Sequence, residues 1–188
     1  IHGNLVVLGG AAHAADFTGN GNLTILGDVV CVHDGSIDFT GATVTLGGQM
    51  GAGSTTATVG TITTTAATHF IIDGNGNTFQ MPAGVATLAT LTVKRPSGVR
   101  LNGNLAIAGP PSATQPSLHL NGGPLDLNGR NATITVGSAT DRSIKEEIGS
   151  YVVNTGAYSA TAPAGALIYT MDGATAAEAV LSGIGIKS

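Results

Sequence analysis

The run Gly3-Asn4-Leu5-Val6-Val7-Leu8-Gly9 decides the fold, because variants of it recur along the chain. It returns as GNLTILG at residues 21–27 and as GNLAIAG at residues 103–109. Internal repetition at a short period is the sequence signature of repeat architectures. Looser copies keep the same alternation of apolar residues closed by Gly: GSIDFTG at 35–41, ATVTLG at 42–47, SLHLNG at 117–122, LDLNG at 125–129 and ATITVG at 132–137.

Each copy predicts a short β-strand, because apolar residues such as Leu23 and Ile25 alternate with residues that would face the other side. A single strand of this kind cannot bury its apolar face alone, whereas stacked copies share a continuous core. We therefore expect an all-β chain folded as a parallel β-helix or β-solenoid of short strands. An antiparallel β-sandwich or barrel has similar turn spacing and is the alternative. Tight corners need positive φ angles, which four Asn-Gly pairs would supply: 20–21, 102–103, 121–122 and 128–129.

The repetition divides the chain into two parts. Residues 1–137 carry the repeats and are expected to form the solenoid body, with a Thr-rich low-complexity part at 51–68. Residues 138–188 lack the repeat and hold five charged residues at 141–147 and a candidate short helix at 175–181. Because solenoids need caps at their ends, we expect residues 138–188 to be a capping or assembly segment.

Composition excludes several classes of protein. Charged residues make up 10% of the chain, against roughly 25% in soluble domains, and the 42% of hydrophobic residues argues against disorder. A net charge of −4 without a basic stripe argues against a nucleic-acid partner. No apolar run approaches the roughly 20 residues of a membrane-spanning helix. Cys31 is the only cysteine, and its place in an apolar run predicts a small buried hydrophobe.

The expected location is outside the cell. A surface with so few charges fits extracellular repeat proteins better than cytosolic enzymes. The chain begins with Ile1 and carries no signal peptide, so either a leader was removed or the chain is a fragment. Removal of a leader agrees with a protein that is secreted or displayed on a cell surface.

Two runs carry a resemblance to known proteins: ATLTVKRPSGVRLNGNLAI at 89–107 and PLDLNGRNATITV at 124–136. They resemble the strand pattern of repeat-rich bacterial secreted surface proteins and adhesins, including type IX secretion substrates. Phage fibre proteins carry similar Gly-Asn-Leu-Thr strands. The resemblance implies a β-solenoid with an exported structural role. Its motifs encode coil geometry and not chemistry, so it carries over no site residues.

Motifs for common chemistry are missing from the sequence. It has no phosphate-binding loop, no cysteine pair and no His-Glu-x-x-His or Gly-x-Ser-x-Gly motif. His13 and His33 would align on neighbouring coils, although solvated corners are the simpler interpretation of both. The best metal candidate is a glycine-rich loop in which Asp73, Asn75 and Asn77 place oxygens at alternate positions, as Ca²⁺ prefers. A plain turn is the competing interpretation, because no Glu completes the loop.

Acidic and basic side chains are too few to predict catalysis. Asp28, Asp34 and Asp38 form the only dense acidic group, and each suits a corner of a coil. Thr-x-Thr pairs, such as those at 43/45 and 90/92, would suit a flat ice-binding array, although ordinary strand alternation predicts the same pairs. Three basic residues flank a Pro-Ser-Gly turn and are expected to be solvated: Lys94, Arg95 and Arg100.

Together these features predict a non-catalytic, extracellular structural or adhesive surface protein that associates with itself into fibres or oligomers. Exposed strand edges and open ends of a solenoid favour such association. Surface glycans are further candidate partners, whereas no nucleic-acid partner, no membrane span and no cofactor beyond the candidate Ca²⁺ is expected. Two alternatives stay open: a carbohydrate-binding or polysaccharide-degrading β-helix, and a phage fibre or decoration protein.

Overall fold

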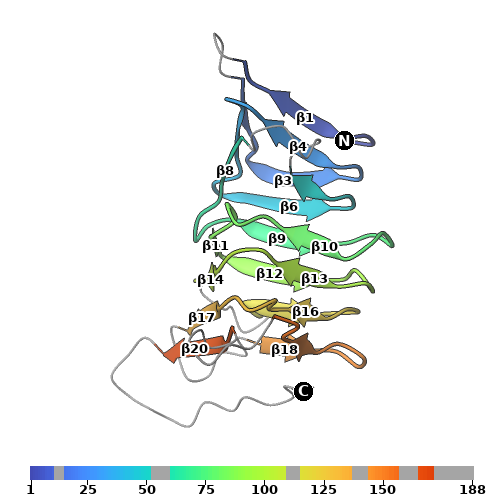
Figure 1. Ribbon diagram of the computed structural model, residues 1–188, viewed down its shortest axis with the longest axis vertical. Helices are drawn as coiled ribbons and strands as arrows, with labels where there is room; N and C mark the ends of the chain where they lie inside the picture. The colour runs from blue at the N-terminus through green and yellow to red at the C-terminus, as the bar shows by residue number, and fades with distance from the viewer. Residues whose placement is uncertain (11–14, 52–59, 109–114, 137–143, 157–164, 172–188) are drawn as a thin grey trace.

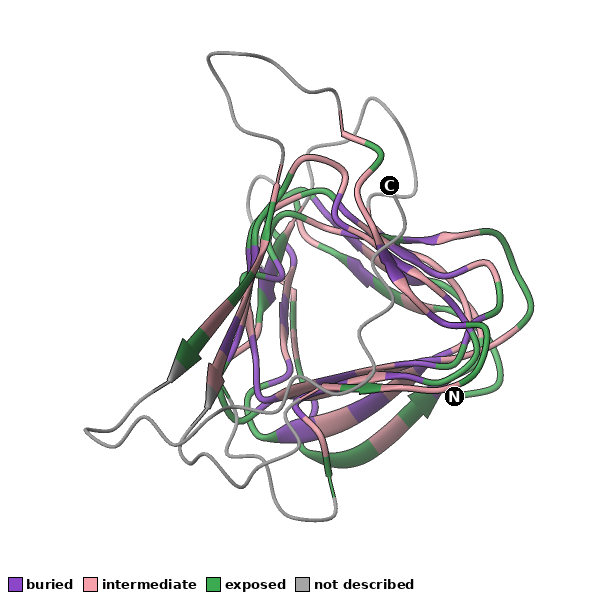
Figure 2. Cartoon of the chain, turned by 90° about the horizontal axis from the view of Figure 1, so that it is seen from below, coloured by how far each residue is buried: buried purple, intermediate pink, exposed green. Residues whose placement is uncertain are grey.

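The computed structural model shows a β-solenoid of stacked short strands (Figure 1). Every strand pairing among the described residues is parallel, so the expected all-β solenoid is confirmed and the antiparallel sandwich is excluded for this part of the chain. Seen along the stack, the coils outline a triangle (Figure 2). The structure describes residues 1–10, 15–51, 60–108, 115–136, 144–156 and 165–171.

The three sides of the triangle are stacks of strands. One side is a single six-stranded sheet: β3 (Gly21–Ile25), β6 (Ala42–Leu46), β9 (His69–Ile72), β12 (Thr90–Val93), β15 (Leu118–Leu120) and β18 (Ile144–Glu146). The second side has two sheets: β1 (Leu5–Leu8), β4 (Val29–Val32) and β7 (Met50–Gly51), then β10 (Phe79–Met81), β13 (Val99–Leu101), β16 (Leu125–Asp126) and β19 (Val152–Val153). The third side also has two: β2 (Asp16–Thr18), β5 (Ser36–Asp38) and β8 (Thr61–Thr63), then β11 (Thr87–Leu88), β14 (Leu105–Ile107), β17 (Ala132–Val136) and β20 (Leu167–Met171).

The core is a column of aliphatic and phenylalanine side chains inside the triangle. Strands bury alternate residues, as in β6, where Ala42, Val44 and Leu46 are buried and the threonines between them face outward. Register stacks buried residues of successive coils on one another, such as Val44 on Phe70. Phe39 and Phe70 meet edge to face, with ring centroids 5.9 Å apart. The shared interior therefore stabilises strands that are too short to fold alone.

Cys31 lies in this core with no exposed surface, as its apolar run predicts. Its Sγ lies 3.2 Å from the carbonyl oxygen of Gly35. Burial raises the pKa of the Cys31 thiol, because the thiolate would lose its hydration. The residue therefore behaves as a small apolar side chain in the packing.

Corners of the coils use glycine in two different ways. The Asn-Gly prediction is confirmed for Gly21, Gly122 and Gly129, which have positive φ angles. It is wrong for Gly103, which is not among the positive-φ residues. There the reason for glycine is space, since a Cβ atom would lie 2.7 Å from the Cα of Ala83 on the preceding coil. Close approach of two backbones therefore explains the fourth pair.

The stacking extends past residue 137. β18 adds to the six-stranded sheet beside β15, β19 pairs with β16, and β20 pairs with β17. These strands form the last coil that the structure describes, so a capping or assembly role for residues 138–188 stays a prediction. The candidate helix at 175–181 lies outside the described residues. None of the described residues belongs to a helix long and apolar enough to cross a membrane.

Candidate functional site

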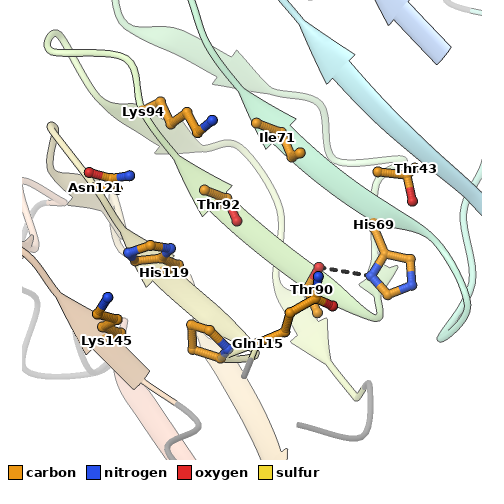
Figure 3. Close-up of a pocket in the computed structure, with 11 residues that line it drawn as sticks. Thr43, His69, Ile71, Thr90, Thr92, Lys94, Gln115, His119, Asn121 and Lys145 are labelled. Carbon is orange, nitrogen blue, oxygen red and sulfur yellow. Dashed lines mark hydrogen bonds between the residues drawn. The ribbon is translucent and has the colours of Figure 1, made fainter. Parts of the chain in front are cut away.

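A groove with a volume of about 440 Å³ lies on the outer face of the six-stranded sheet (Figure 3). Side chains from five consecutive strands of the sheet, β6, β9, β12, β15 and β18, and from the segments beside them meet here. The groove thus runs along the stack and not along any one strand. Its lining residues are Thr43, His69, Ile71, Thr90, Thr92, Lys94, Gln115, Pro116, His119, Asn121 and Lys145.

Strand register brings the floor of the groove together. Residues between the buried positions of each strand face outward, and parallel pairing stacks them into columns. One column contains Thr43, His69 and Thr90, and the next contains Ile71, Thr92, His119 and Lys145. In the first column His69 Nδ1 lies 2.9 Å from Thr90 Oγ1, which ties β9 to β12. Hydrogen-bonding side chains are therefore spaced by one strand separation along the groove, about 4.8 Å.

The walls come from segments that flank the strands. Lys94 follows β12 and Asn121 follows β15, and both lie on the same side of the groove in Figure 3. Gln115 and Pro116 precede β15 and also line the groove, and Gln115 lies on the opposite side, beside Thr90, in Figure 3. Lys94 and Asn121 continue the outward alternation of β12 and β15, so residues just beyond the strand ends bound the groove.

Positive charge gathers in the groove, although the chain carries a net charge of −4. Its lining includes Lys94, Lys145 and two histidines, and no Asp or Glu. Glu147, just beyond the lining, accepts a hydrogen bond from Lys145 Nζ at 2.7 Å and lies 3.3 Å from His119 Nε2. Those hydrogen bonds, that of Lys145 first, lower the pKa of Glu147 below its usual value. Lys94 forms no salt bridge with any described residue.

This arrangement supplies donors and hydroxyl groups but no paired acids. Hydrolysis of a glycosidic bond ordinarily uses two carboxyl groups across the scissile bond. Among the lining residues the titratable groups are amines and imidazoles only. The groove is therefore built for hydrogen bonding and for attraction of negative charge.

The candidate calcium loop surrounds a cation of the protein itself. The backbone carbonyl oxygens of Asp73 and Asn77 accept hydrogen bonds from the Arg95 guanidinium, at 2.9 and 2.8 Å. Two more carbonyl oxygens, those of Gly47 and Gly48, accept from the Arg95 Nη2 atom. The Asp73 carboxylate accepts from the backbone N–H of Gly74.

Calcium binding at Asp73, Asn75 and Asn77 stays a prediction. Asn75 and Asn77 are exposed. No cluster of three or more His, Cys, Asp or Glu residues suited to a metal ion occurs in the described part of the chain.

The expectation that Arg95 is solvated is wrong. Its side chain is 1% exposed and lies over the Phe79 ring, 5.8 Å from the centroid. Burial lowers the pKa of the guanidinium, while the nearby Asp73 and Asp28 carboxylates oppose that shift. The turn at residues 96–98 therefore places a charged side chain inside the fold, where backbone carbonyls compensate its lost hydration.

Two of the three residues in the acidic group, Asp28 and Asp38, accept hydrogen bonds from the backbone. Asp28 Oδ1 accepts from the backbone N–H of Gln49, which joins two successive coils. Asp38 Oδ1 accepts from the backbone N–H of Thr40, and hydrogen bonds of Thr40 lower the Asp38 pKa. Asp34 is exposed in the turn after β4. His33 in the same turn has a φ angle of 56°, and His13 lies outside the described residues.

The residues that line the groove were not predicted from the sequence to form one site. Thr43, Thr90 and Thr92 belong to the Thr-x-Thr pairs, but β9 separates those pairs and places His69 and Ile71 between them. His119 and Asn121 belonged to the repeat copy at 117–122 and Lys145 to the charged run at 141–147, and none of the three was in a motif for binding or catalysis. The usable signal was their outward position in each strand, which becomes a site only when the register between coils is known. Comparison of the chain with protein-family models, with curated proteins and with solved structures finds no match.

Proposed function

We propose that this chain is a non-catalytic, extracellular structural solenoid that adheres to glycans through the groove on its six-stranded sheet. The observation that carries this proposal is the alignment of hydrogen-bonding side chains from five consecutive coils along one groove. Hydroxyl, amide and imidazole groups both donate and accept hydrogen bonds, as the hydroxyls of a sugar require. A groove that runs along a stack suits an extended polymer better than a compact metabolite.

The proposed location and the proposed absence of catalysis rest on different observations. The low content of charged residues and the resemblance to bacterial surface proteins and phage fibres favour an exported protein on a cell or virion surface. Absence of carboxylates from the groove lining favours binding over cleavage. A polysaccharide-degrading β-helix is the competing function, and turnover separates the two.

A glycan panel tests the proposal. The full chain is expected to bind at least one polysaccharide without releasing new reducing ends or unsaturated products. Thr92→Phe fills the groove from its floor and is expected to abolish binding. Thr133→Phe is the matched control, because Thr133 also faces outward from a central strand but belongs to β17 on another side. Absence of binding to every glycan, or equal loss in both variants, would rule the proposal out.

Self-association is a second candidate function, supported by a separate surface. Four of the large hydrophobic side chains that are exposed gather around the first described coil: Ile1, Val6, Leu8 and Leu26. β1 lies at the edge of its sheet, where it pairs with β4 alone among the described strands (Figure 1). Unpaired edges with apolar side chains template further strands. Sedimentation velocity over a concentration series is expected to show a rising mass, and a constant monomer mass would contradict it.

A further inference from the structure

We infer that the side of the groove that bears Lys94 and Asn121, with Lys145 two strands from Lys94 along the stack, binds the carboxylate or sulfate groups of an acidic glycan. This inference rests on the proposed function and narrows it to one class of polysaccharide. The three side chains come from the segment after β12, the segment after β15, and β18. Lys94 and Asn121 lie on the same side of the groove in Figure 3, and Lys145 lies beyond His119, two strands along the stack from β12.

Lys94 is the central cation of the proposed site. It is exposed, lines the groove and forms no salt bridge with any described residue. Two basic side chains outside the groove have partners: Arg95 donates to backbone carbonyl oxygens, and Arg100 pairs with Asp126. A cation left without a partner beside a hollow attracts an anion at little desolvation cost.

Lys145 and Asn121 supply the remaining contacts. The Lys145 ammonium has three N–H donors, of which one reaches Glu147 at 2.7 Å. Glu147 lies outside the lining and also contacts His119, so it holds Lys145 and His119 in position along the groove. The Asn121 side chain adds an amide. Acidic groups spaced along a glycan would meet Lys94 and Asn121 at one point and Lys145 further along the stack, with Thr92 and His119 on the floor for the sugar hydroxyls.

Other polyanions fit this part of the groove less well. Proteins that bind single-stranded nucleic acids use aromatic side chains on which the bases stack. The lining has no Phe, Tyr or Trp, and it has only two side chains that are always charged. A saccharide needs hydrogen bonds and few charges, which agrees with this composition. The observations therefore favour an acidic glycan over a nucleic acid.

The experiment measures binding of the full chain to four immobilised probes: polygalacturonate for carboxylates, dextran sulfate for sulfates, neutral dextran, and oligothymidylate. An acidic glycan is expected to bind at least about tenfold more tightly than neutral dextran, with the difference shrinking as salt rises. The preference between polygalacturonate and dextran sulfate identifies the acidic group. Oligothymidylate that binds as tightly as the better acidic glycan would overturn the inference.

Variants locate the interaction. Lys94→Met is expected to weaken acidic glycan binding about tenfold, whereas Lys94→Arg retains it because the charge is kept. Arg130→Met is the matched control, since Arg130 is an exposed cation at a corner away from the groove. Unchanged acidic glycan binding in Lys94→Met would overturn the inference. If a neutral glycan binds as well as an acidic one and Thr92→Phe abolishes binding of both, the preference for acidic glycans is wrong but the proposed function stands. If no glycan binds, the proposed function fails with it.

Discussion

At the scale of the residue, Arg95 is the side chain whose loss should lower the free energy of unfolding most. It donates to backbone carbonyls on two segments of successive coils, 47–48 and 73–77. Arg95→Met would remove the guanidinium donors from these carbonyls, of which Asn77 O keeps a hydrogen bond from Gln49 Nε2. We expect the free energy of unfolding to fall by about 3–5 kcal/mol, which urea denaturation would measure.

The control variants separate geometry from charge. Arg95→Lys keeps the charge but loses the planar fork of donors, so its stability is expected to lie between those of the wild type and Arg95→Met. The exposed Arg130→Met should change the free energy of unfolding by less than about 0.5 kcal/mol. A similar loss in Arg130→Met and Arg95→Met would contradict the special position of Arg95.

At the scale of the element, Asp126 links three coils. Its Oδ1 atom accepts from the backbone N–H groups of Asn128 and Thr155, its Oδ2 atom accepts from Thr155 Oγ1 at 2.6 Å, and Arg100 Nε of β13 lies 3.6 Å away. Burial acts to raise the Asp126 pKa, but the hydrogen bonds from Thr155 and Asn128 and the charge of Arg100 lower it on balance.

A depressed pKa in the folded state fixes the sign of the pH dependence. The stabilisation by Asp126 is present above the unfolded pKa of about 3.9 and is lost as the pH falls through the lower folded pKa. Asp126→Asn is therefore expected to be less stable than the wild type by about 1–2 kcal/mol at pH 7, with the difference narrowing below about pH 4. Urea denaturation at pH 7 and pH 3 measures it. Asp34→Asn, an exposed carboxylate with no side-chain partner among the described residues, is the control. A difference that stays constant with pH would contradict the assignment.

The sequence predicts the positions of the strands better than it predicts how the strands stack. Alternation in 42–46 predicts both the strand and its buried face, because that signal is local. β18 escapes the same reasoning, since Ile144 is followed by charged residues and the strand is three residues long. Parallel pairing in register over 20 residues, as between Phe79 and Val99, or over 35, as between Ala132 and Leu167, depends on loops that leave no periodic trace.

The groove and the set of backbone carbonyls around Arg95 could not be predicted from the sequence, and the reason is the same for both. Lys94, His119 and Lys145 lie far apart in sequence and come together only through register and the irregular segments beside the strands. Arg95 follows a charged residue and precedes a proline, a pattern typical of a solvated turn. Its burial depends on carbonyl oxygens from residues 47–48, two coils away, which no local pattern reveals.

At the scale of the whole molecule, the triangular column has two kinds of surface with different roles. Its sides are polar and present the groove, whereas the first described coil presents apolar side chains around an unpaired strand edge. Val6 and Leu8 of β1 are 49% and 61% exposed, although large apolar side chains elsewhere in the described strands are mostly buried. Burial of such side chains between copies is favourable at about 25 cal/mol per Å² of apolar surface.

Lysine at these two positions tests that role. In the double variant Val6→Lys and Leu8→Lys, both changes lie on the outward face of β1, so the core formed around Val7 stays intact. Two added charges remove the apolar contact and repel a second copy, as lysines do on natural edge strands. We expect sedimentation velocity to show a lower mass for this variant than for the wild type at the same concentration. Thr133→Lys with Thr135→Lys is the control, since both residues lie on β17, which is paired on both edges by β14 and β20. Equal loss of association in the two double variants would assign the effect to net charge, and no loss in either would place the contact elsewhere on the column.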